Sequence, residues 1–219
     1  HDITGDGGNI SGFDNATNTG YGGTQRTGDL IVKNSPWVDV RAYGAVPDWD
    51  GSTGTDSTSA IQAALDNASA NGGRTVIIVG RFKITAPLVL PYKGWLVGIN
   101  SSRYRTWSDA AAPPNSEIFN AGTGVALSIN TLAGYRYKIA DLCITGSVST
   151  SHGIQSTVAA HELFISNVIL RGHGGDGINA VAGSSRLTDS LILNNHGDGI
   201  DTLGPLSISN NYIQGNNLW

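Results

Sequence analysis

The sequence predicts an all-β protein, a parallel β-helix preceded by a single α-helix. Two repeated markers carry this prediction. The first is Ile/Leu-x-Asx-x-x-Ile/Leu, which occurs four times, with its Asx residue at Asp141, Asn167, Asp189 and Asn210. The second is a Gly-Ile pair that keeps step with the first marker and has its isoleucine at Ile154, Ile178 and Ile200.

The spacing of these markers decides the architecture. Successive Asx residues are 26, 22 and 21 positions apart, too few for a unit that holds a helix as well as its strands. One coil of short parallel strands per repeat accounts for this spacing, with neighbouring coils about 4.8 Å apart. We therefore expect the three isoleucines to stack on consecutive coils. The Asx residues are expected at turns, where such side chains bond to nearby backbone.

The segment 1–35 differs in composition from the rest of the chain. It is rich in Gly, Asn and Thr and holds few large apolar side chains. Because it can bury little surface, we predict a flexible N-terminal arm or neck. The chain starts at His1 without an initiator methionine or an apolar signal segment, which indicates a processed or trimmed piece.

Regular structure is predicted from Pro36 onward. Residues 37–40 alternate apolar and polar side chains, as a half-buried strand does. A helix is predicted between the loop at 44–55 and Gly72-Gly73, with capping residues at its start. Its apolar face consists of Ile61, Ala64, Leu65 and Ala68. Strand-like runs follow at residues 75–79, 81–84 and 88–90.

Three stretches of this region resemble a known module. They are VDVRAYGA (38–45), TDSTSAIQAAL (55–65) and GGRTVII (72–78). Together they resemble the N-terminal module of pectate lyase-like right-handed β-helix proteins, in which a strand and a capping helix precede the first coil. The sequence departs from that module at Val79-Gly-Arg-Phe82 and in the lengthened loop VPDWDGSTGTDS.

The resemblance implies an all-β, single-stranded right-handed parallel β-helix with an N-terminal capping α-helix. It would occupy 36–219, with a capping module at 36–90 and repeats at about 117–219. Phage tailspikes, capsule depolymerases and secreted polysaccharide lyases, hydrolases and epimerases share this module. The module carries no catalytic residues, so no activity is transferred with it.

Charge and composition exclude several partners. The formal net charge is −4, and no Lys/Arg-rich run occurs, which argues against nucleic acid and an anionic membrane surface. No apolar run is long enough to span a bilayer. The single cysteine, Cys143, rules out an intrachain disulfide.

Stacked coils bring residues of equal register together, which makes the repeated aspartates candidate catalytic residues. Asp176 and Asp198 lie two residues before their Gly-Ile isoleucines, and Asp201 lies one residue after Ile200. A pair of close carboxyl groups is what glycoside hydrolysis needs. The same cluster could instead hold Ca²⁺ if the protein is a lyase. The third interpretation is that Asp before Gly only serves the turn.

Candidate substrate-binding residues are of two kinds. Trp95, Tyr104 and Trp107 could stack on the apolar faces of sugars, or they could be buried in the cap. The polar candidates are Arg171, His173 and His196. Arg171 could bind an acidic sugar or stay solvated. The tripeptide around His173 matches one found in polygalacturonases, but the neighbouring aspartate motifs occur in a different order. Both histidines therefore read as exposed turn residues.

The sequence thus predicts a polysaccharide-binding and -degrading β-helix, extracellular, secreted or in a virion tail. It would be the N-terminal part of a tailspike-type depolymerase or of a secreted glycan hydrolase or lyase. The alternative is a non-catalytic β-helix for adhesion or tail architecture. No cofactor is required, apart from Ca²⁺ in a lyase. The next core isoleucine would fall near position 221, so we expect a longer parent chain or a homo-oligomer, such as a trimer, to cover the last coil.

Overall fold

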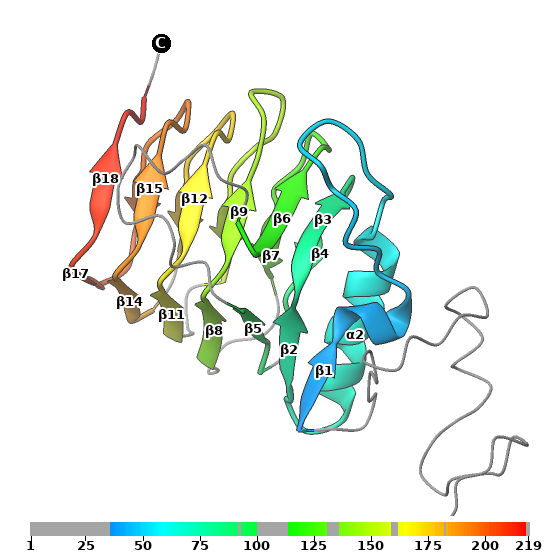
Figure 1. The fold of residues 1–219 in the computed structure, drawn as a ribbon. Helices are drawn as coiled ribbons and strands as arrows, with labels where there is room; N and C mark the ends of the chain where they lie inside the picture. The colour runs from blue at the N-terminus through cyan, green and yellow to red at the C-terminus, as the bar shows by residue number, and fades with distance from the viewer. Residues whose placement is uncertain are drawn as a thin grey trace, which may run out of the picture. The chain divides into compact units, whose positions relative to one another are not determined.

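The computed structural model describes residues 36–91, 93–99, 114–130, 136–158, 162–181 and 183–217. These residues lie in one compact unit. The predicted arm at 1–35 lies outside the described residues. Within them, every strand pairs in parallel with its neighbours, as the repeat spacing predicts (Figure 1).

The described strands form three sheets. Sheet A has the order β1-β2-β5-β8-β11-β14-β17, sheet B the order β3-β6-β9-β12-β15-β18 and sheet C the order β4-β7-β10-β13-β16. Sheet A consists of Trp37–Asp39, Thr75–Ile78, Trp95–Gly98, Arg136–Ala140, Glu162–Ser166, Ser185–Thr188 and Leu206–Ser209. Sheet B consists of Gly80–Ile84, Ser116–Asn120, Cys143–Thr145, Ile169–Arg171, Leu191–Leu193 and Tyr212–Gln214. Sheet C consists of Leu88–Val89, Leu127–Ile129, Ile154–Ser156, Ile178–Ala180 and Ile200–Thr202.

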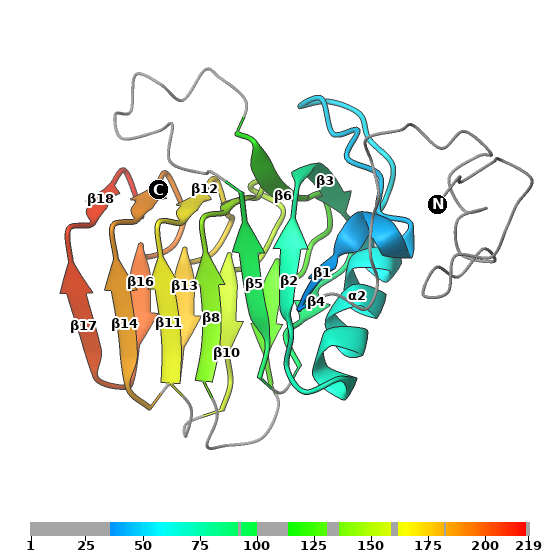
Figure 2. The same cartoon turned by 60° about the horizontal axis from the view of Figure 1, so that its bottom comes forward.

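From β2 onward the chain visits the sheets in the order A, B, C, so that each complete coil contributes one strand to each sheet (Figure 2). Ile154 pairs with Ile178, and Ile178 pairs with Ile200, which confirms the predicted register. Ile154 and Ile178 are buried in the core that runs along the inside of the coils. Ile200, on the last described strand of sheet C, is partly buried and packs against the same core. The predicted parallel β-helix is therefore confirmed.

The Asx column lies at the turn between sheet A and sheet B. Asp141, Asn167, Asp189 and Asn210 all have left-handed backbone, with φ between 53° and 54°. Asn and Asp tolerate this conformation better than other residues that carry a side chain, because they bond to local backbone. The Asn167 amide also donates to Asp141 Oδ1 on the preceding coil over 2.6 Å. The sequence marker is thus the residue that turns the chain from one sheet into the next.

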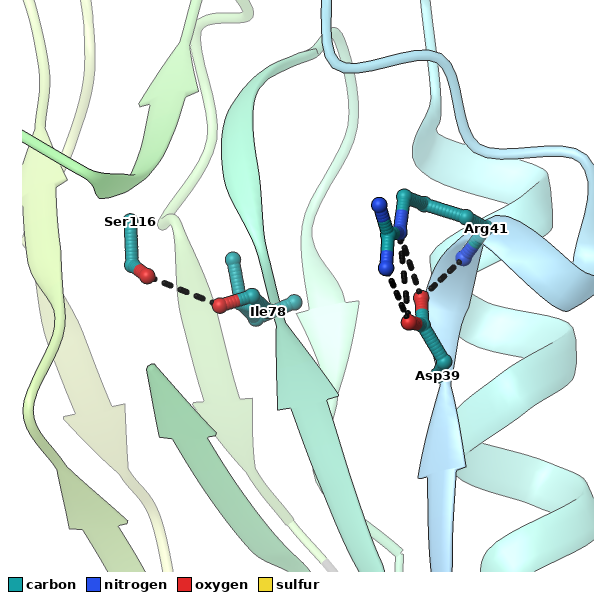
Figure 3. Close-up of polar contacts among 4 residues, drawn as sticks. All are labelled: Asp39, Arg41, Ile78 and Ser116. Atoms are coloured by element: carbon teal, nitrogen blue, oxygen red, sulfur yellow. Dashed lines mark hydrogen bonds and ion pairs between the residues drawn. The ribbon is translucent and has the colours of Figure 1, made fainter. Parts of the chain in front are cut away.

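The N-terminal end of the core is covered by α2 (Thr58–Ala70), whose buried residues are the four of the predicted apolar face (Figure 1). The predicted strand at 37–40 is shorter than expected, because the 3₁₀ helix η1 begins at Val40 (Val40–Tyr43). Asp39 caps η1: its carboxylate accepts the backbone N–H of Arg41 and pairs with the Arg41 guanidinium over 2.7 Å (Figure 3). This local bond favours the turn over further strand.

A second polar contact joins successive coils at the end of β2. The buried hydroxyl of Ser116 donates to the carbonyl oxygen of Ile78 over 2.8 Å (Figure 3). The same hydroxyl oxygen accepts the backbone N–H of Ile99. Cys143 is a free, buried thiol, and burial raises its pKa to about 11. Among the described residues, no helix is long and apolar enough to cross a membrane.

Candidate functional site

The predicted carboxylates gather around the outer face of sheet C. The middle residue of each three-residue strand points outward there, because the residues on either side of it face the core. Register aligns Gln155, Asn179 and Asp201 on this face. Asp176 and Asp198 lie in the turns that lead into β13 and β16, two residues before the first strand residue.

The turn residues form a relay between coils. His152 Nδ1 accepts the backbone N–H of Asp176 over 3.0 Å, and Asp176 Oδ1 accepts the backbone N–H of Asp198 over 2.8 Å. Each side chain therefore satisfies the backbone of the next coil. A side chain at Gly197 would overlap the Asp176 carboxylate, which explains the glycine before Asp198. The turn interpretation of the repeated Gly-Asp-Gly is supported for Asp176.

Asn179 connects two of the three predicted catalytic carboxylates. Its side-chain amide donates to Asp176 Oδ2 over 2.8 Å and to Asp201 Oδ2 over 3.2 Å. Because both bonds come from one nitrogen, the distance between Asp176 Oδ2 and Asp201 Oδ2 cannot exceed the sum of the two donor–acceptor distances. Such closeness is compatible with the separation of about 5–5.5 Å between carboxyl groups in retaining glycosidases. The alignment of Asn179 with Asp201 was predicted from the sequence. Its hydrogen bonds to the two carboxylates were not.

The three carboxylates differ in exposure. The Asp176 side chain is only 14% exposed, because the relay holds it against its neighbours. Asp198 and Asp201 are exposed. The two exposed carboxylates can meet a ligand directly, while Asp176 supports them through Asn179 and through the backbone of Asp198.

His152 lies beside Asp176. Its Nδ1 is 3.1 Å from Asp176 Oδ2, in addition to the bond from the Asp176 backbone. A neutral Nδ1 accepts the backbone N–H, whereas a protonated Nδ1 donates to the carboxylate. Within the described part of the chain, no three His, Cys, Asp or Glu side chains are grouped so as to hold a metal ion. Asp176, Asn179 and Asp201 therefore place two carboxylates around one amide, and we call these three residues the carboxylate array.

The prediction that His173 is an exposed turn residue is wrong. Its side chain is buried, and its Nε2 lies 3.3 Å from the carbonyl oxygen of Ile144. Its backbone N–H donates to Asn195 Oδ1, just as the Asn195 backbone N–H donates to Asn216 Oδ1 one coil later. His173 is therefore the first member of an inward-facing polar column. Burial, together with the nearby His152, lowers the pKa of His173 to about 4.

This buried imidazole predicts a loss of stability in mild acid. Because the folded pKa lies below the unfolded value of about 6.5, the neutral ring stabilises the fold fully above pH 6.5. That contribution is lost as the pH falls towards 4, by about 2 kcal/mol at pH 5. His173→Asn should keep the column, since Asn195 and Asn216 already occupy it, and should flatten the stability curve between pH 7 and 5. Urea unfolding across this range measures the difference; parallel curves for both proteins would contradict the prediction.

The other predicted binding residues lie elsewhere. Trp95 is 42% exposed on the outer face of sheet A, so it does not share a sheet with the carboxylates. Arg171 ends β12 in sheet B, near the Cys143 thiol. His196 lies in the turn before β16, and its backbone donates to His173. Tyr104 and Trp107 lie outside the described residues. The structure therefore brings the carboxylates together and separates them from Trp95.

Sequence reasoning also missed a buried ion pair on sheet B. Glu117 is buried and accepts from Arg81 over 2.7 Å and from the Thr145 hydroxyl over 2.8 Å. The Trp49 ring stacks on Phe119 beside it, with ring centroids 4.1 Å apart. The acidic loop that lengthens the capping module thus covers this part of sheet B. No sequence signal pairs residues so far apart without the strand register.

Comparison with known proteins identifies the fold. No protein-family model and no curated protein matches the chain. The A-module of a mannuronan C-5 epimerase from Azotobacter vinelandii matches with a TM-score of 0.61 and 20% identity, over 81% of this chain and 56% of that one. The ORF18 protein of Geobacillus virus E2 matches with a TM-score of 0.53 and 19% identity, over 74% and 31% of the two chains.

A third match is the catalytic unit of a thermostable GH87 α-1,3-glucanase from Streptomyces thermodiastaticus. Its TM-score is 0.50 at 18% identity, over 89% of this chain and 32% of that one. At these identities the likeness establishes a shared fold. The chain spans between 31% and 56% of the length of these three structures.

Proposed function

We propose that this chain, whose parallel β-helix fold is shared by a mannuronan epimerase, a glucanase and a phage protein, binds and cleaves polysaccharide on the outer face of sheet C. The observation that carries the proposal is the Asp176–Asn179–Asp201 array on that face. The chain would be the N-terminal part of a tailspike-type depolymerase or of a secreted glycan hydrolase or lyase.

The array suits glycoside hydrolysis for a geometric reason. One carboxyl group must protonate the leaving oxygen, while its partner acts on the anomeric carbon directly or through water. The shared Asn179 amide fixes two carboxylates at a short separation. The exposed Asp198 and Asp201 then face the solvent from which the glycan arrives. Fixing the acid and the nucleophile before the substrate binds lowers the entropic part of the barrier.

The test is a glycan panel with product analysis. Purified protein is incubated with uronate polymers and neutral glucans, and new reducing ends and unsaturated uronates are measured separately. Reducing ends without unsaturation identify a hydrolase, and unsaturated ends identify a lyase. The triple variant Asp176→Asn/Asp198→Asn/Asp201→Asn should release neither. Equal cleavage by the variant and the wild type would overturn the assignment of the site.

A non-catalytic role is the second candidate, and one observation favours it. The Asp176 carboxylate is already used to bind the backbone of the next coil. If polysaccharide is bound but never cleaved, the protein serves adhesion or tail architecture. Such a protein would be extracellular or part of a virion tail, and we expect it to form a homotrimer. Light scattering of the purified protein tests the oligomeric state.

A further inference from the structure

The outer face of sheet A carries a row of alternating rings and cations. Strand register places Trp95 beside Lys138, Lys138 beside Phe164 and Phe164 beside Arg186. Each residue comes from a different coil, on the neighbouring strands β5, β8, β11 and β14 (Figure 2). We call these four residues the sheet A stripe.

The stripe is open to solvent. Trp95 is 42% exposed, Lys138 and Arg186 are exposed, and Phe164 is half-buried. All four point outward, because the residues that flank them in their strands face the core. The Lys138 ammonium lies 5.9 Å from the centre of the Trp95 ring, so the first ring and the first cation of the stripe are already in contact.

A hollow lies at the far end of the stripe. Its volume is about 450 Å³, and its lining includes Phe164, Arg186 and Glu162, together with Pro205 and Ser207 of the next coil. It therefore offers an apolar ring, a guanidinium and a hydroxyl to one ligand group. This combination suits a sugar, whose ring has apolar faces and polar edges.

The charge of the stripe selects an anionic ligand. In the described part of the chain, neither Lys138 nor Arg186 forms an ion pair. The acidic side chain nearby, Glu162, is already paired with Arg136. The stripe is thus locally cationic in a chain with a formal net charge of −4. Two copies that met face to face through the stripe would bring like charges together, which disfavours a two-fold contact through this face.

We propose that the sheet A stripe binds an anionic polysaccharide that lies along the axis of the β-helix. Adjacent strands are about 4.8 Å apart, so the two rings are separated by roughly 10 Å and the two cations by the same distance. A polysaccharide with a regular acidic repeat can stack a sugar on each ring and place a carboxylate or sulfate at each cation. The stripe lies on sheet A and the carboxylate array on sheet C, so this binding does not depend on cleavage.

The test measures binding by affinity electrophoresis in gels that contain polymannuronate, polygalacturonate or neutral dextran. Wild-type protein should be retarded by at least one uronate polymer and not by dextran, and added salt should weaken the retardation. Trp95→Ala and Phe164→Ala should each weaken binding about tenfold, as expected for the loss of one stacked ring. Lys138→Gln combined with Arg186→Gln should weaken it at least as much and reduce its dependence on salt.

The matched control is Thr188→Ala, which changes the same strand and the same face two residues from Arg186. It should bind like the wild type, and thermal unfolding should confirm that all variants are folded. The proposal is overturned if no uronate polymer retards the wild type, or if dextran is bound equally. It is also overturned if the stripe variants dissociate an oligomer, because the face would then be an interface between copies. Cleavage of short oligosaccharides by the stripe variants should be unchanged, which separates this proposal from the catalytic one.

Discussion

Asp201→Asn is expected to lower the rate of glycan cleavage about 10³-fold, within the range that a positioned acid or base contributes to catalysis. Asp201 is exposed at the outer face of sheet C, and its carboxylate has one partner there, the Asn179 amide. Asparagine keeps an oxygen for that bond but can neither donate an acidic proton nor attack as an anion. The thermal midpoint of the Asp201→Asn variant should therefore stay at the wild-type value, since exposed substitutions rarely change stability by more than about 0.5 kcal/mol.

Two further variants separate catalysis from structure. Asp189→Asn removes a carboxylate from the Asx column between sheets A and B and should leave cleavage unchanged, because Asn occupies equivalent turns. Asp176→Asn should lower both the rate and the free energy of unfolding, the latter by about 1–2 kcal/mol, since an amide replaces an oxygen that faces the Asn179 amide. Initial rates and urea midpoints measure both effects. Full activity in Asp201→Asn would remove this residue from the mechanism.

Gly98→Ala is expected to destabilise the fold by about 4 kcal/mol, at the upper end of what overpacking costs. Gly98 ends β5 at the register position that Asp141 occupies one coil later. A methyl group there would overlap the carbonyl oxygen of Asp141 and lie 2.8 Å from Ser116 Cβ. The first obstacle is backbone, which cannot rotate away, so two coils must separate. Scanning calorimetry should show a thermal midpoint lower by roughly 10 °C.

Gly44→Ala is the matched control for this prediction. Gly44 has a φ of 94°, but nothing lies within 4 Å of an added methyl group. The cost there is conformational and should be about 1 kcal/mol. If both variants lost stability equally, the close approach of coils at Gly98 would not be the cause.

The stacking of coils could be predicted from the sequence, because the same residue types recur at the positions where every coil needs them. Asp141 and Asn167 recur where the backbone must turn left-handed, and Ile154 and Ile178 recur where a side chain must fill the core. The start of η1 was missed because the alternating pattern of residues 37–40 predicts strand. The bond between Asp39 and the Arg41 backbone, which favours the turn, spans only two residues and leaves that pattern unchanged.

The site was predicted in part, for a related reason. Equal register, counted from the Gly-Ile pair, aligned Asp176 with Asp198 and Asn179 with Asp201. The Asn179 amide, which the sequence did not single out, joins Asp176 to Asp201. His173 was misplaced because a histidine between glycines looks like an exposed turn, whereas its column faces inward and is continued by Asn195. Trp95 was grouped with Tyr104 and Trp107 by proximity in the sequence, which does not indicate which of the three sheets a strand joins.

The regular stacking also bears on how such a protein can change over evolutionary time. Hydrogen bonds between neighbouring coils join residues 22 positions apart, as between Val168 and Ser190 and between Asp176 and Asp198. Deleting residues 167–188 would join Ser166 to Asp189 at a turn of the same kind, so a gene could lose or duplicate one coil without rebuilding its cap. The sheet A stripe would then lose its second cation, because Ser207 would become the neighbour of Phe164 in place of Arg186. Gain and loss of whole coils is therefore a route by which ligand preference can change while the fold persists.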